Sequence, residues 1–250
     1  MQSVVDETKQ YPACIDIKNV SKSFGRKQVL FDINLSVPHY QILGLLGPSG
    51  SGKTTLVKMI AGVDSASGGE VYVLEEKMPK LSMMHKIGYM AQSDALYGEL
   101  TAKENLQFFA SMYNLSKQKQ KERIYAVMEL VNLTEHLNKQ VKQYSGGMKR
   151  RLSLAIALIH EPSVLILDEP TVGIDPVLRK SIWEELYNLS SQGTTIVVTT
   201  HVMDEAEKCD NLGMIREGRL IASGTPEELS KATSLNTLEG AFLYYGGVKL

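Results

Sequence analysis

The stretch Gly47-Pro48-Ser49-Gly50-Ser51-Gly52-Lys53-Thr54 decides the fold of this chain of 250 residues. It matches the pattern G-x-x-x-x-G-K-[ST], in which glycines let backbone N–H groups converge on an anion. The apolar run Gln41–Leu46 predicts a buried strand before it, and the spacing of Leu56, Met59 and Ile60 predicts a helix after it. The helix N-terminus attracts phosphate. The lysine supplies a positive charge for the β- and γ-phosphates, and the threonine hydroxyl can ligate Mg²⁺. The stretch therefore predicts a nucleotide-phosphate site.

An acidic pair follows a second buried strand. The apolar residues Val164–Leu167 predict this strand, and Asp168 and Glu169 come directly after it. Ligand sites of open α/β sheets lie at the carboxyl ends of the strands. The aspartate is suited to Mg²⁺ held through water, and the glutamate to orienting or deprotonating an attacking water. The two motifs together leave a kinase, a GTPase, a helicase and a transport ATPase open.

The triplet Ser145-Gly146-Gly147 opens an apolar-periodic helix. A serine and two glycine N–H groups at a helix N-terminus form a second anion site. The cations Lys149-Arg150-Arg151 occupy the first turns of this helix, where they oppose the helix dipole. We interpret this unfavourable placement as a sign that an anionic phosphate approaches there.

Short strands dominate the first part of the chain, and helices the middle. Thr101 and Glu104 form a capping box at the start of the helical part. The alternating or short apolar stretches that predict strands are 15–18, 33–37, 70–74 and 87–90.

The last part predicts strand, helix and strand in turn. Asp175 followed by proline starts the helix, and the β-branched run 194–200 forms the next buried strand. A hairpin follows over 212–222, and a capping box at Thr225 opens a terminal helix. We expect one α/β domain with inserted subdomains.

With these motifs in order, the sequence resembles the ATP-binding cassette (ABC) ATPase family over about residues 14–245. The segment Tyr144–Ala155, YSGGMKRRLSLA, is similar to the family signature LSGGQ and its basic continuation. Gln92, in YMAQ, matches the Q-loop, and Gly173-Ile174-Asp175-Pro176 matches the D-loop. His201, after TTIVVTT, matches the switch histidine.

The resemblance implies a P-loop NTPase core with a mainly parallel sheet, an N-terminal antiparallel β-subdomain and an inserted α-helical subdomain at about residues 93–160. It implies a single domain over 14–245, with residues 1–13 as an N-terminal extension. The short spacing between Lys53 and Gln92 leaves no room for a long coiled-coil insertion, which argues against the chromosome-maintenance and DNA-repair relatives.

The resemblance also implies a role for each site residue. Phe24, in SKSFG, would stack on adenine. Asp168 would hold Mg²⁺ through water, and Gln92 would contact Mg²⁺ or the attacking water and sense a membrane partner. Glu169 would be the catalytic base, and His201 would bind the γ-phosphate; with Gln92 and Lys53 these are the expected catalytic residues. The residues expected to hold the phosphates are Gly47, Ser49, Gly50, Gly52, Lys53, Thr54 (also on Mg²⁺) and Thr55.

Dimerisation is implied as well. In this family, Ser145 and the N–H groups of Gly146 and Gly147 contact the γ-phosphate of ATP bound to the opposite subunit, and Asp175 bridges the dimer. Tyr144 and Met148 replace the flanking Leu and Gln of LSGGQ. The resemblance therefore does not imply a contact by that glutamine across the interface, whereas the residues that contact phosphate are intact. The catalytic glutamate and histidine are both present, so we expect a homodimer, and a paired heterodimer stays open.

The segments LDEPTVGIDPVLR and GRLIASGTPEEL resemble those of ABC ATPases in the drug-export and polysaccharide-export branch. That branch implies an ATP-hydrolysing subunit at the cytoplasmic face of the membrane, which powers a separate integral-membrane permease. The alternative is a soluble ABC ATPase acting on a ribosome or another macromolecular complex. Translation-acting relatives usually carry two cassettes on one chain, whereas this chain has one.

Composition agrees with an ordinary globular protein. Lys plus Arg number 27 and Asp plus Glu 28, so the net charge of −1 gives no bulk attraction to nucleic acid, and no nucleic-acid partner is expected. The longest apolar runs fall short of the ~18 residues that span a bilayer. The first 13 residues lack a basic and an apolar region, so we expect no secretory signal. Cys14 and Cys209 show no metal-ligand spacing, which favours incidental reduced thiols.

Overall fold

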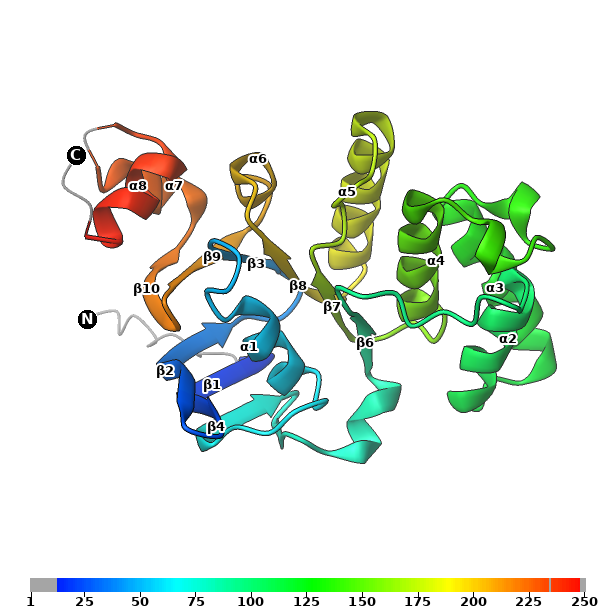
Figure 1. The fold of residues 1–250 in the computed structure, drawn as a ribbon, viewed down its shortest axis with the longest axis horizontal. Helices are drawn as coiled ribbons and strands as arrows, with labels where there is room; N and C mark the ends of the chain where they lie inside the picture. The colour runs from blue at the N-terminus through cyan, green and yellow to red at the C-terminus, as the bar shows by residue number, and fades with distance from the viewer. Residues whose placement is uncertain (1–12, 234, 248–250) are drawn as a thin grey trace, which may run out of the picture.

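The computed structural model describes residues 13–233 and 235–247, so the predicted extension over 1–13 lies almost wholly outside the described residues. Two β-sheets and the helices around them form the structure (Figure 1). The larger sheet has six strands in the order β10-β9-β3-β8-β7-β6. These strands are β3 (Ile42–Leu46), β6 (Ile87–Met90), β7 (Val164–Asp168), β8 (Thr195–Thr200), β9 (Asn211–Arg216) and β10 (Arg219–Gly224).

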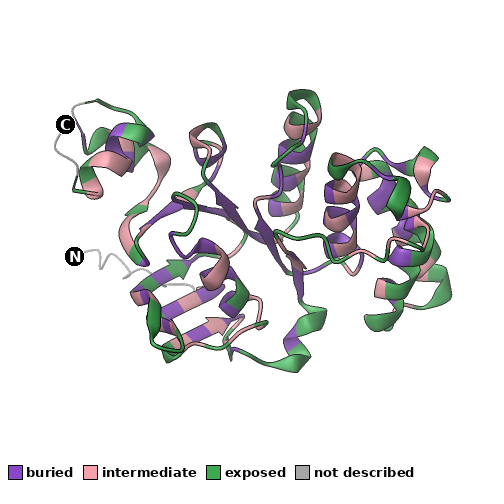
Figure 2. Cartoon of the chain, viewed as in Figure 1, coloured by how far each residue is buried: buried purple, intermediate pink, exposed green. Residues whose placement is uncertain are grey.

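The larger sheet is mainly parallel, as the sequence predicts. Only β9 and β10 pair in antiparallel fashion. Every residue of β3, β7 and β8 is buried, and Figure 2 shows these strands in purple at the centre of the molecule. Along β7, Leu165 and Leu167 pack into one hydrophobic cluster, and Val164 and Ile166 into the other. Burial on both faces explains the uninterrupted apolar runs in the sequence.

The smaller sheet is the predicted antiparallel N-terminal sheet. Its strands run in the order β2-β1-β4-β5, and β1 pairs in antiparallel fashion with both β2 and β4. Ile15 and Ile17 on β1 are buried, whereas Lys18 is exposed, which is the alternation of a half-exposed strand. The four strands are β1 (Ile15–Phe24), β2 (Lys27–Val37), β4 (Gly68–Val73) and β5 (Glu76–Lys77).

Helix α1 (Lys53–Ile60) connects the two sheets through their shared core. Its residues Leu56, Val57, Met59 and Ile60 are buried in a cluster that takes side chains from both sheets. The helix follows β3 after the glycine-rich stretch, so this stretch lies at the carboxyl end of a buried parallel strand.

Three helices gather at the opposite end of the molecule from α8 (Leu238–Tyr245), as Figure 1 shows. They are α2 (Ala102–Met112), α3 (Lys117–Leu130) and α4 (Gly146–Leu158). The predicted capping box is confirmed: the Thr101 hydroxyl accepts from the N–H of Glu104, whose carboxylate accepts from the N–H of Thr101. A 3₁₀ turn, η1 (Leu81–His85), leads into β6, which pairs with β7.

The C-terminal part contains two helices that the sequence did not predict, α6 (Met203–Ala206) and α8. Asp175 caps α5 (Pro176–Ser191) as expected, and α6 follows β8. The capping box at Thr225 is also confirmed, but the helix it opens, α7 (Pro226–Lys231), has only six residues. The last helix is α8, whose sequence shows no polar residues at helical spacing. It buries Leu238 and Ala241 in the main core. Its start is capped locally, by the Thr237 hydroxyl that accepts from the N–H of Gly240 at 3.0 Å, and its packing against the core adds to its stability.

Candidate active site

The glycine-rich loop needs its glycines for conformation and for close approach. Gly50 and Gly52 have φ of 78° and 109°, values that L side chains rarely adopt. A Cβ at Gly47 would lie 2.1 Å from the carbonyl oxygen of Ile215, on β9. The loop is therefore held in shape both by its own backbone and by the neighbouring strand.

A pocket of about 210 Å³ lies over this loop, and we call it the loop pocket. Lys53 is buried, and its Nζ donates to the carbonyl oxygens of Gly47 (2.7 Å) and Pro48 (3.0 Å). Burial lowers the pKa of this lysine, and the nearby carboxylates of Asp168 and Glu169 oppose that shift. The residues that line the pocket are Val29, Ser49, Gly50, Gly52, Lys53, Thr54, Thr55, Gln92 and Glu169. Of these, only Val29 escaped the sequence analysis, because a valine on an alternating strand carries no functional signal.

Asp168 ends β7 and is fully buried. Its Oδ1 accepts from the hydroxyls of Thr199 (2.5 Å) and Thr54 (3.2 Å), whereas Oδ2 is buried with no hydrogen-bond partner. A buried carboxylate oxygen without a partner is costly unless a ligand or water satisfies it. The arrangement of a free carboxylate oxygen beside a threonine hydroxyl fits Mg²⁺, a cation that prefers oxygen ligands. Among the described residues no group of three or more His, Cys, Asp or Glu side chains could hold a metal, so substrate oxygens and water would complete the coordination.

Glu169 follows directly and adopts a positive φ of 53°. Such values are uncommon outside glycine and concentrate at functional sites. Its N–H donates to the Thr199 hydroxyl at 3.0 Å, and its Oε1 lies 3.1 Å from Nδ1 of His201. The glutamate side chain is 14% exposed and the histidine side chain 45% exposed, so the histidine of this pair is open to water. The structure thus brings together the predicted base and the predicted γ-phosphate ligand.

The interpretation of the basic residues at the start of α4 is wrong for both arginines. Arg150 is buried and donates to backbone carbonyl oxygens of the loops after β6 and β7. Arg151 donates to the carbonyl oxygens of Val131 and Asn132, at the end of α3. These contacts satisfy carbonyl groups that lack ladder partners, so the two charges need no phosphate to explain them.

Glu205 is a buried site residue that the sequence analysis missed. Its Oε2 accepts from Thr200 at 2.7 Å, its Oε1 accepts from Thr171, and Arg179 lies 3.9 Å away. One carboxylate on α6 therefore ties the segment after Glu169 to the segment before His201. A short run of acidic residues reads as a solvated helix, so no sequence signal marks the buried one.

The signature triplet does not line the loop pocket of its own chain. Ser145 caps α4, its hydroxyl accepting from the N–H of Met148 at 3.3 Å. A Cβ at Gly146 would meet nothing within 4 Å, and one at Gly147 would lie 3.4 Å from the Gly173 carbonyl oxygen. In Figure 1, α4 lies on the other side of β6 and β7 from α1. The triplet is an open helix start beside the predicted D-loop.

Phe24 and Asp175 also lie outside the residues that line the pocket. Phe24, at the end of β1, is 52% exposed, and Nζ of Lys22 lies 4.9 Å from the centroid of its ring. The Asp175 carboxylate accepts from the N–H of Leu178 at 3.0 Å, as the cap of α5.

Comparison with known proteins identifies the family of this chain. The chain belongs to the ABC transporter family, whose family model matches residues 30–172. It is 41% identical over 237 residues to the probable multidrug ABC transporter ATP-binding protein YbhF of Escherichia coli K12, covering 92% of this chain and 41% of that protein. It is 43% identical over 221 residues to the Nod factor export ATP-binding protein I of Rhizobium johnstonii, covering 87% of this chain and 71% of that protein. The linearmycin resistance ATP-binding protein LnrL of Bacillus subtilis is 40% identical, covering 90% and 73%.

Solved structures agree with the family. An ATP-binding subunit of an ABC transporter superposes with a TM-score of 0.86 at 26% identity, covering 93% of this chain and 99% of that one. The ATP-binding cassette MJ0796, in a dimeric post-hydrolysis state bound to ADP and Pi, gives a TM-score of 0.79 at 28% identity, covering 84% and 98%. The predicted family and fold are therefore confirmed.

The chain spans less than half of the length of the E. coli relative. Within its described part, we find no helix with both the length and the apolar character needed to cross a lipid bilayer.

Proposed function

We propose that this chain is the ATP-hydrolysing subunit of an exporter of the ABC type. The observation that carries the proposal is the grouping of Lys53, Gln92 and Glu169 in one pocket, with His201 beside the glutamate. Family membership and the transporter names of the relatives support the same conclusion. The names of the relatives cited here concern multidrug transport, Nod factor export and linearmycin resistance, and they give no support to the ribosome alternative.

In the proposed mechanism, the glycine-rich loop holds the phosphates through its N–H groups. Lys53 leaves its loop carbonyl partners to neutralise the β- and γ-phosphates. Thr54 and, through water, Asp168 would hold Mg²⁺, which neutralises charge on the phosphates when it is bound. Glu169 accepts the proton of the attacking water, and His201 steadies the γ-phosphate beside it. Gln92, which also lines the pocket, orients that water.

The same proposal makes the active unit a dimer. Ser145, Gly146 and Gly147 form an anion-binding helix start that lies outside the pocket of their own chain. A second chain can bring its triplet to this pocket, with Asp175 at the contact between the chains. The dimeric state of a solved relative supports this arrangement. A homodimer is the simpler assignment, because one chain carries all of these residues.

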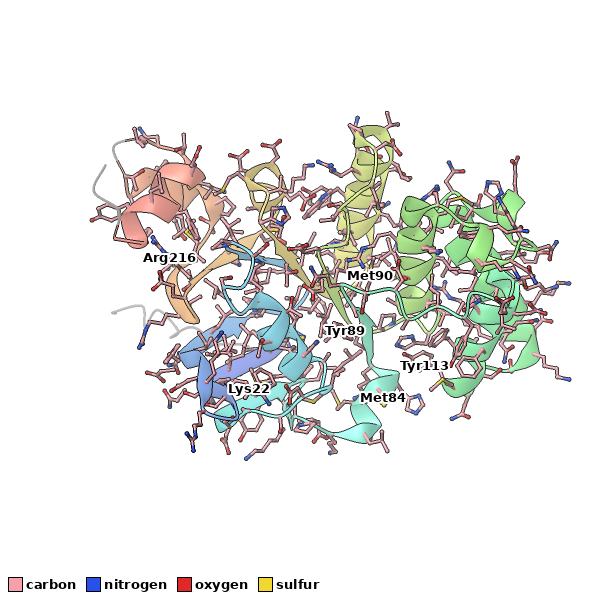
Figure 3. All side chains as sticks on the ribbon, viewed as in Figure 1. Lys22, Met84, Tyr89, Met90, Tyr113 and Arg216 are labelled. Atoms are coloured by element: carbon pink, nitrogen blue, oxygen red, sulfur yellow. The ribbon has the colours of Figure 1, made fainter. Side chains whose placement is uncertain are left out.

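We propose a permease as the further partner, and an apolar groove as the place where it docks. Leu81 and Met112 are 82% and 55% exposed, although both are large and apolar. Figure 3 labels Met84 and Tyr113, which line the same groove between η1 and α2. The groove has a volume of about 290 Å³ and also includes His85 and Phe109. An exposed apolar surface of this kind marks an interaction site, and η1 leads through β6 to Gln92.

Docked in this way, the chain would hydrolyse ATP at the cytoplasmic face of a membrane, and the permease would select the cargo. Membrane sedimentation tests the assignment: the full chain should pellet with membranes, and Leu81→Glu with Met112→Glu should release it. Leu235→Glu is the matched control, because Leu235 is 53% exposed on the far C-terminal part. Sedimentation with ribosomes instead of membranes would contradict the exporter proposal.

Hydrolysis is tested separately, by Glu169→Gln in the full chain. This change should keep ATP binding and lower turnover by about 10²-fold or more, the scale of a lost general base. Glu184→Gln removes an exposed carboxylate on α5 and should leave turnover unaltered. Near-normal turnover of Glu169→Gln would exclude the assigned base.

A further inference from the structure

Arg150 lies on α4, three residues after the end of the signature triplet, and only 6% of it is exposed. Its guanidinium reaches the loops that follow two neighbouring strands. Nη1 donates to the carbonyl oxygens of Ala91 (2.7 Å) and Gln92 (3.0 Å). Nη2 donates to the carbonyl oxygens of Asp168 and, at 2.8 Å, of Glu169. One side chain thus holds four backbone carbonyls.

These four carbonyls belong to residues that have left the sheet or are leaving it. Strands β6 and β7 are parallel neighbours, with Met90 opposite Leu167, so their following loops emerge side by side. Glu169 follows the last residue of β7 and has a positive φ, so its carbonyl lies outside the strand. Buried carbonyl groups need donors, and a planar guanidinium with five N–H groups can serve several at once. The position of the arginine therefore constrains the backbone of both Gln92 and Glu169.

We infer that Arg150 is a positioning residue that links the start of α4 to the backbone of Glu169 and Gln92. The inference rests on the proposed function, in which the triplet contacts the ATP of the partner and the glutamate acts as base. A helix moves as a rigid body, so a shift of Ser145 by the partner's nucleotide displaces Arg150 as well. The catalytic glutamate of a chain is then aligned only when its own signature helix is engaged. This device would couple hydrolysis at the two sites of the dimer.

The neighbouring Arg151 provides a matched comparison. It lies on the same helix and also donates to two backbone carbonyls, but both belong to the end of α3. Removing either guanidinium takes a donor from backbone carbonyls, which are part-buried at Val131 and exposed at Asn132 for Arg151, so both changes should lower the melting temperature. Only the change at Arg150 releases the loops of the site.

The experiment compares Arg150→Met with Arg151→Met in the full chain, by melting temperature, affinity for a fluorescent ATP analogue, and kcat. Arg150→Met should lower kcat roughly tenfold or more, because a small misplacement of a catalytic group is costly. Its ATP affinity should stay within about threefold, since Arg150 does not touch the residues that line the loop pocket except through the backbone of Gln92 and Glu169. Arg151→Met should keep kcat within about twofold. Arg150→Lys, which retains a cation but cannot span both loops, should have an intermediate kcat.

Equal losses of kcat at Arg150 and Arg151, in proportion to their melting temperatures, would overturn the inference. Normal kcat in a folded Arg150→Met would also overturn it. If Arg150→Met does not fold, the comparison of Arg150→Lys with Arg151→Lys, by kcat and melting temperature, decides the matter. Glu169→Gln runs in parallel: if it still turns over ATP, the proposed site fails, and if it is inactive while Arg150→Met is normal, only the present inference fails.

Discussion

The hydroxyl of Thr199 lies 2.5 Å from Oδ1 of Asp168 and donates to it, across the parallel pair of β8 and β7. The same hydroxyl oxygen accepts from the N–H of Glu169 at 3.0 Å. One buried hydroxyl therefore fixes both the carboxylate assigned to Mg²⁺ and the backbone of the assigned base. It does so from a strand that the sequence marks only as β-branched.

Replacing Thr199 with valine tests this relationship, because valine keeps the shape and removes the hydroxyl. The unfolding free energy should fall by about 1–3 kcal/mol, since two buried polar groups lose a partner. ATP turnover should fall by roughly tenfold as the two acidic residues lose their alignment. Thr195→Val is the control: this buried hydroxyl, at the other end of β8, accepts from the N–H of Tyr40. It should cost similar stability and leave turnover alone, and equal turnover in both variants would contradict the assignment.

Dimerisation is tested at the cap of α4. In a chain that also carries Glu169→Gln, ATP and Mg²⁺ should produce a dimer by size-exclusion chromatography, and Ser145→Arg should abolish it by filling the anion site. The control is Ser116→Arg, because Ser116 caps α3 in the same way, its hydroxyl accepting from the N–H of Lys119 at 3.3 Å. Both changes lose a cap, worth about 1 kcal/mol. A Ser145→Arg chain that still dimerises would refute the shared site.

His160 should make stability depend on pH. Burial lowers the pKa of this histidine to about 4, its Nε2 lies 3.2 Å from the Ile87 carbonyl oxygen, and its ring stacks on Tyr113 at 3.7 Å. Between the ordinary histidine pKa and this value, the unfolded chain binds a proton that the folded chain does not. The stabilisation is therefore complete above about pH 6.5 and is lost as the pH falls towards 4.

The slope should be at most about 1.4 kcal/mol per pH unit, because one histidine exchanges at most one proton between the two states. The ring is partly exposed, so screening by water lowers the slope further. His160→Phe keeps the aromatic stack and should flatten this part of the curve, measured by urea unfolding at a series of pH values. Parallel curves for the two proteins would show that the histidine does not titrate in this way.

Glu205 should contribute strongly to stability. Its carboxylate accepts from Thr171 and Thr200, so Glu205→Ala leaves both hydroxyls and Arg179 without their partner. We expect a loss of about 2–4 kcal/mol in the unfolding free energy. Glu207→Ala, at an exposed position beside the same helix, should change it by less than about 0.5 kcal/mol. Similar losses in the two variants would mean that the buried contacts carry little energy.

The sequence by itself determined the glycine-rich loop, its strand and helix, and the acidic pair, because each is a local pattern with one physical reading. Helix caps at Thr101, Asp175 and Thr225 are local in the same sense, and all three are confirmed. A cap needs only a side chain and the backbone a few residues away. These features follow from short-range chemistry, so neighbouring residues are enough to predict them.

Only the tertiary structure decided which residues support the site. Arg150, Thr199 and Glu205 reach residues 18 to 59 positions away or contact a separate strand, and their own surroundings in the sequence read as a basic turn, a strand and an acidic helix. The same limit explains why the basic run was misinterpreted. Buried polar groups are satisfied by whatever the fold brings near them, and that choice depends on packing between distant segments.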